Sequence, residues 1–360
     1  MWVFGSLLAC HPWDEAVVDG LRTLERSFRT DHAGLATLRI DLDEGETAFL
    51  VTTLVPDNAR VRVDSLTDPD GTEAFNADVV LRTTEAKTSA VWLSTVNTFG
   101  WPIQRGDREP DGDRWNVDLL TTDSTGVPLA ADCVSTVLIK TDDNFSRGTL
   151  QVVVVYTDGV DDEADWVLAV ASAVDAWGAL MAERGVDLDV SFAQWSGDPV
   201  GAPGFSDPLP WEELSAAQPL GSIKVVLAHV IAEFPAALGI TGNIPAPLIP
   251  SGQSGVLVGL DYAAGIDGSF SELEIQLLAE TLAHESAHAT GVFHPVEVDW
   301  DLYDALPDTP TCVTEQSCEA EFSSNLMFPY PICTSAFSCI AQTDLTDDQV
   351  SMVQRFVATR

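Results

Sequence analysis

The chain has 360 residues, enough for two or three domains of ordinary size. Hydrophobic residues make up 46% and aromatic residues 8% of it, which excludes a disordered protein. No segment reaches the roughly 20 apolar residues of a membrane span. The formal net charge of −39 repels phosphate backbones, so nucleic acid is excluded as a partner. An acidic surface attracts cations, which makes calcium a candidate cofactor, although no EF-hand spacing occurs.

The first ten residues read MWVFGSLLAC. Leu7 to Cys10 resemble the lipobox at which the signals of bacterial lipoproteins are cleaved, which predicts a signal segment over 1–10 and a lipid on Cys10. No Lys or Arg precedes the apolar run, so a fraying end or a short buried strand stays an alternative. We expect 11–32 to be a linker. The lipobox implies a secreted protein, or one that a lipid anchors to the bacterial cell envelope.

Residues 33–143 consist of short alternating runs separated by Asp, Gly, Asn and Pro. This rhythm predicts an all-β sandwich, serving as an accessory domain or a pro-domain. The strands that we expect within it are 35–42, 47–55, 59–63 and 114–120.

The pattern changes near residue 148. The run LQVVVVY at 150–156 predicts a buried strand, and apolar residues at helical spacing predict a helix over 163–184. A second domain of the α/β (α+β) class is therefore expected over 148–360. Further strands are expected at 190–195, 223–231 and 256–262, and Gly- and Pro-rich loops at 196–210 and 239–255.

Two more helices of this domain have capping boxes at their starts. Ser271 and Glu274 predict a helix that continues to about Thr290. Thr346 and Gln349 predict a C-terminal helix that ends near residue 358.

The first of these helices carries the motif HExxHxxGxxH, formed by His284, Glu285, His288, Gly291 and His294. Side chains four residues apart share one helix face, so His284 and His288 can bind one ion. Gly291 can adopt the left-handed backbone that ends the helix and returns His294 to the metal. Three histidines leave the fourth position of a tetrahedral zinc open, as in catalytic sites. The motif predicts one catalytic zinc.

Glu285 follows the first ligand and lies beside the open position. Zinc lowers the pKa of a bound water from about 16 to about 7, so Glu285 can act as general base and then protonate the leaving amine. This predicts a zinc-dependent endopeptidase that acts on protein or peptide substrates. A surface-anchored binding lipoprotein with a silent zinc domain is the alternative, but such a protein would need the ligands and not Glu285.

The motif, together with Met327 in the run NLMF, resembles the metzincin clan of zinc metallopeptidases. The resemblance implies a metzincin-like catalytic domain in which Met327 belongs to a turn beneath the zinc. Pro295 is similar to the residue after the third histidine in serralysin-like members. The stretch 306–310, with cysteines after it, is more similar to pappalysin-like members, so the subfamily stays open.

Four of the six cysteines gather near the C-terminus, which predicts disulfides and an oxidising compartment. Three connectivities are open for this group, which comprises Cys312, Cys318, Cys333 and Cys339. Cys133 precedes the second domain, where a thiol could cap the zinc of a latent enzyme, but a structural cysteine is favoured.

Overall fold

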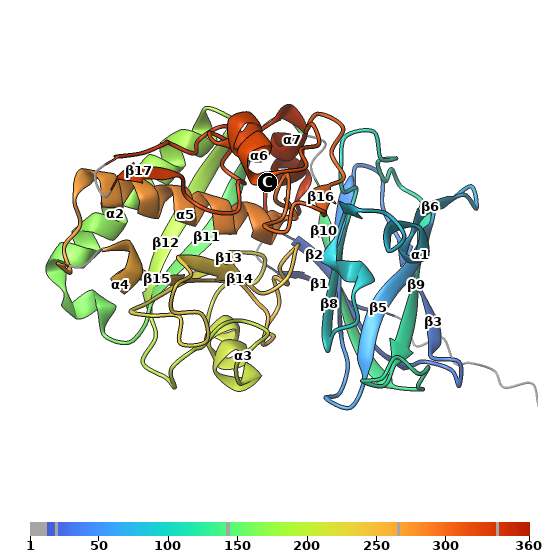
Figure 1. Ribbon diagram of the computed structural model, residues 1–360. Coiled ribbons are helices and arrows are strands. Elements are labelled where there is room, and N and C mark those ends of the chain that lie inside the picture. Colours follow the sequence, from blue (N-terminus) through green and yellow to red (C-terminus); the bar gives the residue numbers. More distant parts are fainter. Residues whose placement is uncertain (1–12, 19–20, 142–144, 265–266, 336–337) are drawn as a thin grey trace, which may run out of the picture.

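The computed structural model describes residues 13–18, 21–141, 145–264, 267–335 and 338–360. Figure 1 shows two units side by side, a β unit built from the first part of the chain and a unit of mixed α/β structure built from the rest. Cys10 and its lipobox lie outside the described residues.

The β unit consists of two antiparallel sheets. The first has the order β1 (Asp14–Val18), β2 (Leu21–Arg29), β10 (Asp132–Lys140), β4 (Ala48–Leu54) and β8 (Val96–Trp101). The second has the order β3 (Leu35–Asp41), β9 (Arg114–Thr122), β5 (Arg60–Thr67) and β6 (Glu73–Asn76), and the short α1 (Ala77–Val80) and β7 (Glu85–Ala86) follow β6.

Aromatic side chains fill the space between these two sheets. Trp115 of β9 lies 6.2 Å from Phe49 of β4 and 6.0 Å from Trp101 of β8, measured between ring centroids. All three are buried. Because these rings come from both sheets, the inner faces of the sheets share one apolar layer.

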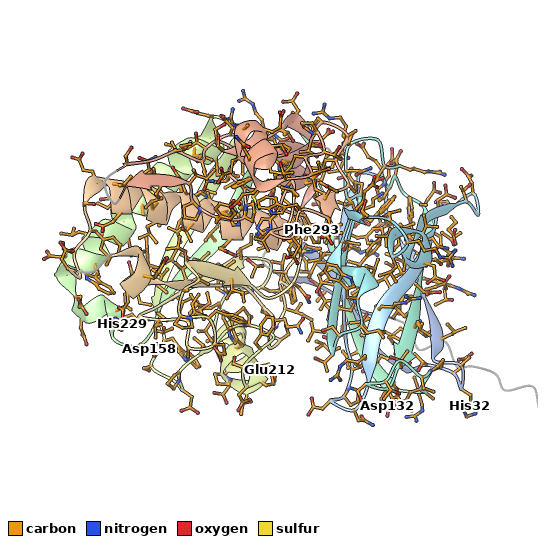
Figure 2. The ribbon with its side chains drawn as sticks, in the orientation of Figure 1. His32, Asp132, Asp158, Glu212, His229 and Phe293 are labelled. Carbon is orange, nitrogen blue, oxygen red and sulfur yellow. A yellow bond between two sulfur atoms is a disulfide. The ribbon has the colours of Figure 1, made fainter. Side chains whose placement is uncertain are left out.

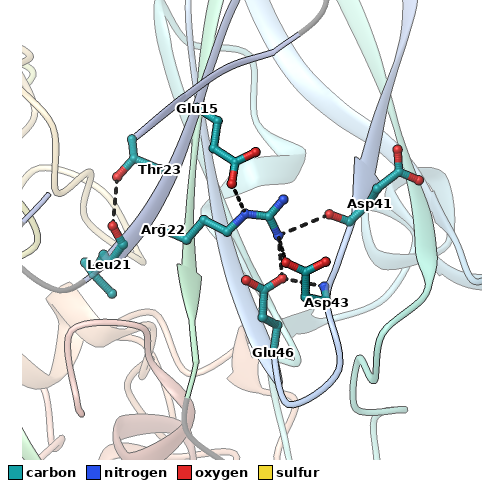
Figure 3. A network of polar contacts seen from close by, with 7 residues as sticks. All are labelled: Glu15, Leu21, Arg22, Thr23, Asp41, Asp43 and Glu46. Atoms are coloured by element: carbon teal, nitrogen blue, oxygen red, sulfur yellow. Dashed lines mark hydrogen bonds and ion pairs between the residues drawn. The ribbon is translucent and has the colours of Figure 1, made fainter. Parts of the chain in front are cut away.

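The expected linker over residues 11–32 is corrected by β1 and β2, which are strands of the first sheet. Leu21 and Leu24 are buried there, so apolar burial holds the interval in the sheet. Figure 3 shows Arg22 of β2, whose guanidinium donates to Glu15 at 2.9 Å and to Glu46 at 2.7 Å. The interval is therefore a structural part of the β unit.

The mixed unit contains a sheet with the order β12 (Val186–Gln194), β11 (Gly148–Tyr156), β13 (Ile223–Ala228), β15 (Val256–Gly259) and β14 (Gly239–Thr241). Its strands are parallel except for β14, which pairs antiparallel with β15 at the edge. Every residue of β13 and β15 is buried, as expected of parallel strands covered on both faces.

Helices cover both faces of this sheet. Helix α2 (Ala164–Ala182) and helix α5 (Glu272–Thr290) pack together on one face. Helix α3 (Pro208–Ala216) covers the other, where Trp211 packs with Val153 and Val155. The remaining elements are α4 (Leu260–Ala263), β16 (Tyr303–Asp304), α6 (Glu315–Phe322), β17 (Cys333–Ser335), β18 (Ser338–Cys339) and α7 (Asp347–Arg355), with 3-10 turns at Ser89–Val91 and Val160–Asp162.

Helix α2 is long and apolar enough to cross a membrane by length and composition. The expectation that no segment reaches this length is therefore wrong. Its Trp166, Val170 and Trp177 are buried, and the helix packs against α5 and β12. These contacts are those of a core helix in a globular unit.

Several expected boundaries differ from the structure. The strand expected over 223–231 ends at Ala228, and the strand expected over 256–262 ends at Gly259, where α4 begins. The expected loop 196–210 includes the start of α3 at Pro208, because Asp207 caps that helix by accepting from Leu209 N–H. The expected loop 239–255 contains β14. Helix α7 ends at Arg355 rather than near residue 358, because the last residues pair with the start of β11 through Leu150 and Thr359.

The four clustered cysteines form two local disulfides, Cys312–Cys318 and Cys333–Cys339. Such bonds persist in oxidising compartments, which points to an extracytoplasmic protein. Cys133 is free and buried in β10, and its thiol donates to the carbonyl of Ala131. Burial raises the pKa of this thiol to about 12. Figure 2 shows its neighbour Asp132 far from Phe293, which precedes the third histidine of the motif, so Cys133 does not lie beside these histidines.

The two units are joined by backbone pairing and by a buried cation. Strand β7 of the β unit pairs in parallel with β16 of the mixed unit. The Lys140 ammonium at the end of β10 is buried and donates to the carbonyls of Gln354, at 3.1 Å, and Thr359. One continuous apolar core includes residues of both units. The β unit is therefore packed against the mixed unit and not merely tethered to it.

Asp304 lies at this junction. It is 6% exposed, and its Oδ1 accepts from Leu306 N–H and from the hydroxyl of Thr309, while Oδ2 has no partner among the described residues. Burial raises the pKa of Asp304 to about 7, and the nearby carboxylates Asp308 and Asp348 act in the same direction. Asp299 and Asp301, which share the loop, are exposed, so the three aspartates form no common cation site.

We expect Asp304→Asn to stabilise the protein at alkaline pH. The raised pKa means that the folded state holds the proton more tightly than the unfolded state. Ionisation of Asp304 therefore lowers the free energy of unfolding as the pH rises from about 4 to about 7. Between pH 5 and pH 8 the free energy of unfolding of the wild type should fall by about 2–3 kcal/mol because of this group. Denaturant titrations at both pH values should show this loss in the wild type and a much smaller one in Asp304→Asn. The exposed variant Asp301→Asn should behave as the wild type, and equal pH dependence in all three proteins would contradict the expectation.

Candidate active site

Helix α5 positions two of the three predicted ligands. Ser271 caps its start, with its hydroxyl accepting from Glu274 N–H and its own N–H donating to the Glu274 carboxylate at 2.7 Å. The last turns carry His284 and His288 one turn apart on one face. Gly291 follows with φ of 115°, a left-handed backbone that favours glycine, and there the chain leaves the helix axis.

The change of direction at Gly291 brings His294 back to the helix. Its Nε2 lies 3.0 Å from Nε2 of His288 and 3.2 Å from Nε2 of His284. The ligand atoms of the three rings all lie within 4.8 Å of one another. In the described part of the chain this is the one group of three or more His, Cys, Asp or Glu side chains close enough to share an ion.

The opposite ring nitrogens define the protonation of the cluster. Nδ1 of His284 lies 2.7 Å from the carbonyl of Leu326, Nδ1 of His288 lies 2.7 Å from the carbonyl of Val292, and Nδ1 of His294 lies 2.8 Å from the carboxylate of Glu297. These oxygens accept, so each Nδ1 carries the proton and donates it. Each Nε2 then presents a lone pair to the other two. Three converging lone pairs repel one another unless a cation lies between them, so the cluster fits a metal ion.

Burial favours the neutral rings that bind metals. It lowers the pKa of His284 to about 3 and that of His288 well below the usual value, and the neighbouring His294 contributes to both shifts. Imidazoles whose Nδ1 atoms have fixed acceptors are a donor set that suits Zn²⁺.

Glu285 is held by the edge strand β14. The Thr241 hydroxyl lies 2.8 Å from Glu285 Oε2 and 3.0 Å from the Glu285 carbonyl, and it can donate to either. A Cβ on Gly239 would lie 2.5 Å from Glu285 Cγ, so only glycine leaves room for this side chain. Burial raises the pKa of Glu285 to about 7, against the opposing effects of Thr241 and His294. A carboxyl with a pKa near neutrality suits proton transfer at physiological pH.

His284 and Glu285 face a pocket of about 370 Å³. Besides α5, its lining comes from the stretch 236–239 up to the start of β14, from Leu326 and residues 328–331, and from Tyr262 and Gln342. His284 of the histidine cluster and the Glu285 carboxylate therefore lie at the side of a space that can receive a substrate side chain.

The turn that contains Met327 supports His284 through its backbone. Asn325 accepts from Met327 N–H at 2.8 Å and donates to Gln349 of α7 at 3.0 Å, which holds the turn in shape. Met327 itself is fully buried in the core. The contact from this turn to the cluster is the Leu326 carbonyl, which accepts from His284.

The sequence interpretation missed Glu297, Thr241 and Gly239. A search for carboxylates one turn after the third histidine would have found Glu297, but no local pattern relates Thr241 to a helix far along the chain. His229 is half-buried just after β13, where its Nδ1 lies 2.9 Å from Asp261 Oδ1. Figure 2 shows it well away from Phe293, so it is not part of the cluster.

No protein-family model and no curated protein matches the chain. Among solved structures, metalloproteinase-II from Bacteroides fragilis is 13% identical, with a TM-score of 0.35, and the match covers 60% of this chain and 55% of that one. A Bacillus subtilis protein is 13% identical, with a TM-score of 0.16, and the match covers 54% of this chain and 46% of that one. A family two carbohydrate esterase from Cellvibrio japonicus is 7% identical, with a TM-score of 0.14, and the match covers 57% of this chain and 67% of that one. The chain thus spans about half of the first two structures. All three TM-scores lie below 0.5, so the function has to be inferred from the site itself.

Proposed function

We propose that the protein is a zinc-dependent endopeptidase of the metzincin type. One observation carries the proposal: three histidine lone pairs, two from α5 and one from the turn after it, converge beside the buried carboxylate of Glu285 and next to a pocket. A binding protein would require the ligands alone. The carboxylate adds a group that can move a proton next to the ion.

The roles of the residues follow from their contacts. His284, His288 and His294 would hold the ion, and their Nδ1 partners keep them neutral and oriented. When bound, zinc supplies Lewis acidity to the scissile carbonyl and acidifies water at the open side of the cluster. Glu285 takes the proton of the attacking water and returns it to the leaving amine. The Thr241 hydroxyl orients the Glu285 side chain for this transfer.

Strand β14 provides the place for the peptide backbone. It pairs with β15 along one side and lies at the edge of the sheet in the described structure. An extended peptide can add to such an edge through backbone hydrogen bonds. Because Thr241 of β14 contacts Glu285, a peptide aligned on this strand would pass directly beside the general base.

The β unit supports this edge, and we propose that it is an accessory β-sandwich rather than a removable pro-domain. Ser89 N–H donates to the Ile244 carbonyl at 2.8 Å, and the Asn243 amide donates to the Val96 carbonyl at 3.2 Å. These bonds hold the segment that follows β14. Loss of the β unit would therefore release the strand on which the substrate is proposed to lie.

The two disulfides and the lipobox at Cys10 support an extracytoplasmic location for this activity, secreted or anchored through a lipid. A chelator experiment tests the activity. The purified protein should contain one equivalent of zinc and cleave denatured casein or a peptide library, as read by mass spectrometry. Removal of the metal should stop cleavage, and added zinc should restore it. Cleavage that persists after complete metal removal, or its absence in fully loaded protein, would contradict the proposal.

A further inference from the structure

One acidic side chain of the pocket has no part in the chemistry described above. Glu280 lies one turn before His284 on α5 and lines the same pocket as His284 and Glu285. Residues four apart share a helix face, so Glu280 lies on the same side of α5 as the first ligand. A helix rises about 1.5 Å per residue, which puts Glu280 about 7 Å along the axis from Glu285.

Glu280 is 6% exposed and forms no ion pair with the described lysines, arginines or histidines. Its Oε1 accepts from the Gln276 amide at 2.8 Å, and the carboxylate also accepts from the backbone of Gln342. Both donors are neutral. No lysine or arginine is among the described residues that line the pocket. Burial raises the pKa of Glu280, against the opposing hydrogen bonds from Gln276 and Gln342.

The rest of the pocket is mostly apolar. Its walls include Leu238 before β14, Leu277 of α5, and Leu326 and Phe328 of the Met327 turn. A side chain bound in this pocket can therefore contact both apolar surface and the Glu280 carboxylate. Lysine and arginine suit such a pocket, because an aliphatic stem carries a cationic head. The cationic head can donate hydrogen bonds to the Glu280 carboxylate, which has acceptor sites beyond those that Gln276 and Gln342 occupy.

We propose that this pocket selects substrates with a lysine or arginine beside the scissile bond, and that Glu280 is the residue that determines this specificity. The inference rests on the proposed peptidase function. The net charge of −39 draws any cationic segment toward the protein, and Glu280 is the acidic residue of the described pocket lining that the proposed proton transfer does not use.

Two peptides that differ only in lysine or norleucine at the residue beside the cleaved bond test the inference, because norleucine keeps most of the stem and lacks the charge. The wild type should cleave the lysine peptide with a kcat/KM about 10- to 100-fold higher, the range for a hydrogen bond to a charged group. In Glu280→Gln the ratio should fall to near one. The ratio compares two substrates on the same active molecules, so partial misfolding of the variant does not change it.

Glu272→Gln is the matched control. It removes the same charge from an exposed position in the first turn of α5, and it should keep the wild-type ratio. Equal cleavage of both peptides by the wild type, or an unchanged ratio in Glu280→Gln, would overturn the inference. If the protein cleaves neither peptide, the proposed function fails, and calorimetric binding of the two peptides then decides the specificity. Tighter binding of the lysine peptide that is lost in Glu280→Gln supports it, and equal binding overturns it.

Discussion

Glu285→Ala should abolish peptide cleavage while the protein still binds one equivalent of zinc. Removal of a general base lowers kcat by about 100- to 10,000-fold. The three histidines keep their Nδ1 partners in this variant, since none of those partners is Glu285. Strand β14 should also stay in place, because the Thr241 hydroxyl can still donate to the backbone carbonyl of residue 285.

The measurement is a kcat on a cleaved peptide, together with the zinc content of the same preparation. Glu285→Gln is the second variant, since it keeps the shape of the side chain and an acceptor for Thr241 but cannot take up a proton. Both variants should be inactive and fully loaded. Glu272→Gln, exposed on the same helix, should retain wild-type activity. Cleavage at more than a tenth of the wild-type rate by a loaded Glu285 variant would rule out this role for the carboxylate.

His288→Ala should remove both the metal and the activity. His288 is 6% exposed and donates from Nδ1 to the Val292 carbonyl at 2.7 Å. Loss of a hydrogen-bond partner of a metal ligand lowers metal affinity by roughly 10- to 100-fold. Loss of the His288 ring removes one of the three ligands themselves, so zinc affinity should fall by more than this. The wild type should also melt at a higher temperature with zinc than after chelation, because an ion that binds only the folded state stabilises it.

Zinc titration and thermal melts of the wild type and the variant check this expectation. In His288→Ala, zinc should no longer raise the melting temperature. The matched control is His229→Ala, which removes a histidine that pairs with Asp261 away from the cluster and should leave zinc binding and cleavage unchanged. A His288→Ala protein that purifies with one tightly bound zinc would contradict the assignment of the ligands.

The parts of the site that the sequence predicts are those coded within one local stretch. A capping box at Ser271 defines the start of α5, and Gly291 can adopt the left-handed backbone at its end. The spacing of His284 and His288 then follows from the helix period. The buried strand at 150–156 and helix α2 are likewise readable from local apolar patterns. In these segments local backbone preferences and burial agree, so the local pattern is sufficient.

Other parts depend on contacts between distant segments. Strand β14 lies in a stretch rich in Gly and Pro that by itself predicts a loop, and its pairing with β15 makes it a strand. Residues 11–32 look like a linker until Leu21 and Leu24 are buried in the first sheet. Local spacing says nothing of such pairings, because they follow from which surfaces meet in the folded chain.

The histidine motif was therefore determined by the sequence alone, since one helix and one turn contain its three histidines. Its surroundings were decided by the tertiary structure. Thr241 comes to Glu285 from β14, Leu326 comes to His284 from a later turn, and Glu280 becomes a pocket residue only when that turn covers α5. The order of residues along a helix specifies which groups can bind one ion. Burial and the packing of remote segments decide what orients those groups and which substrate side chain can reach them.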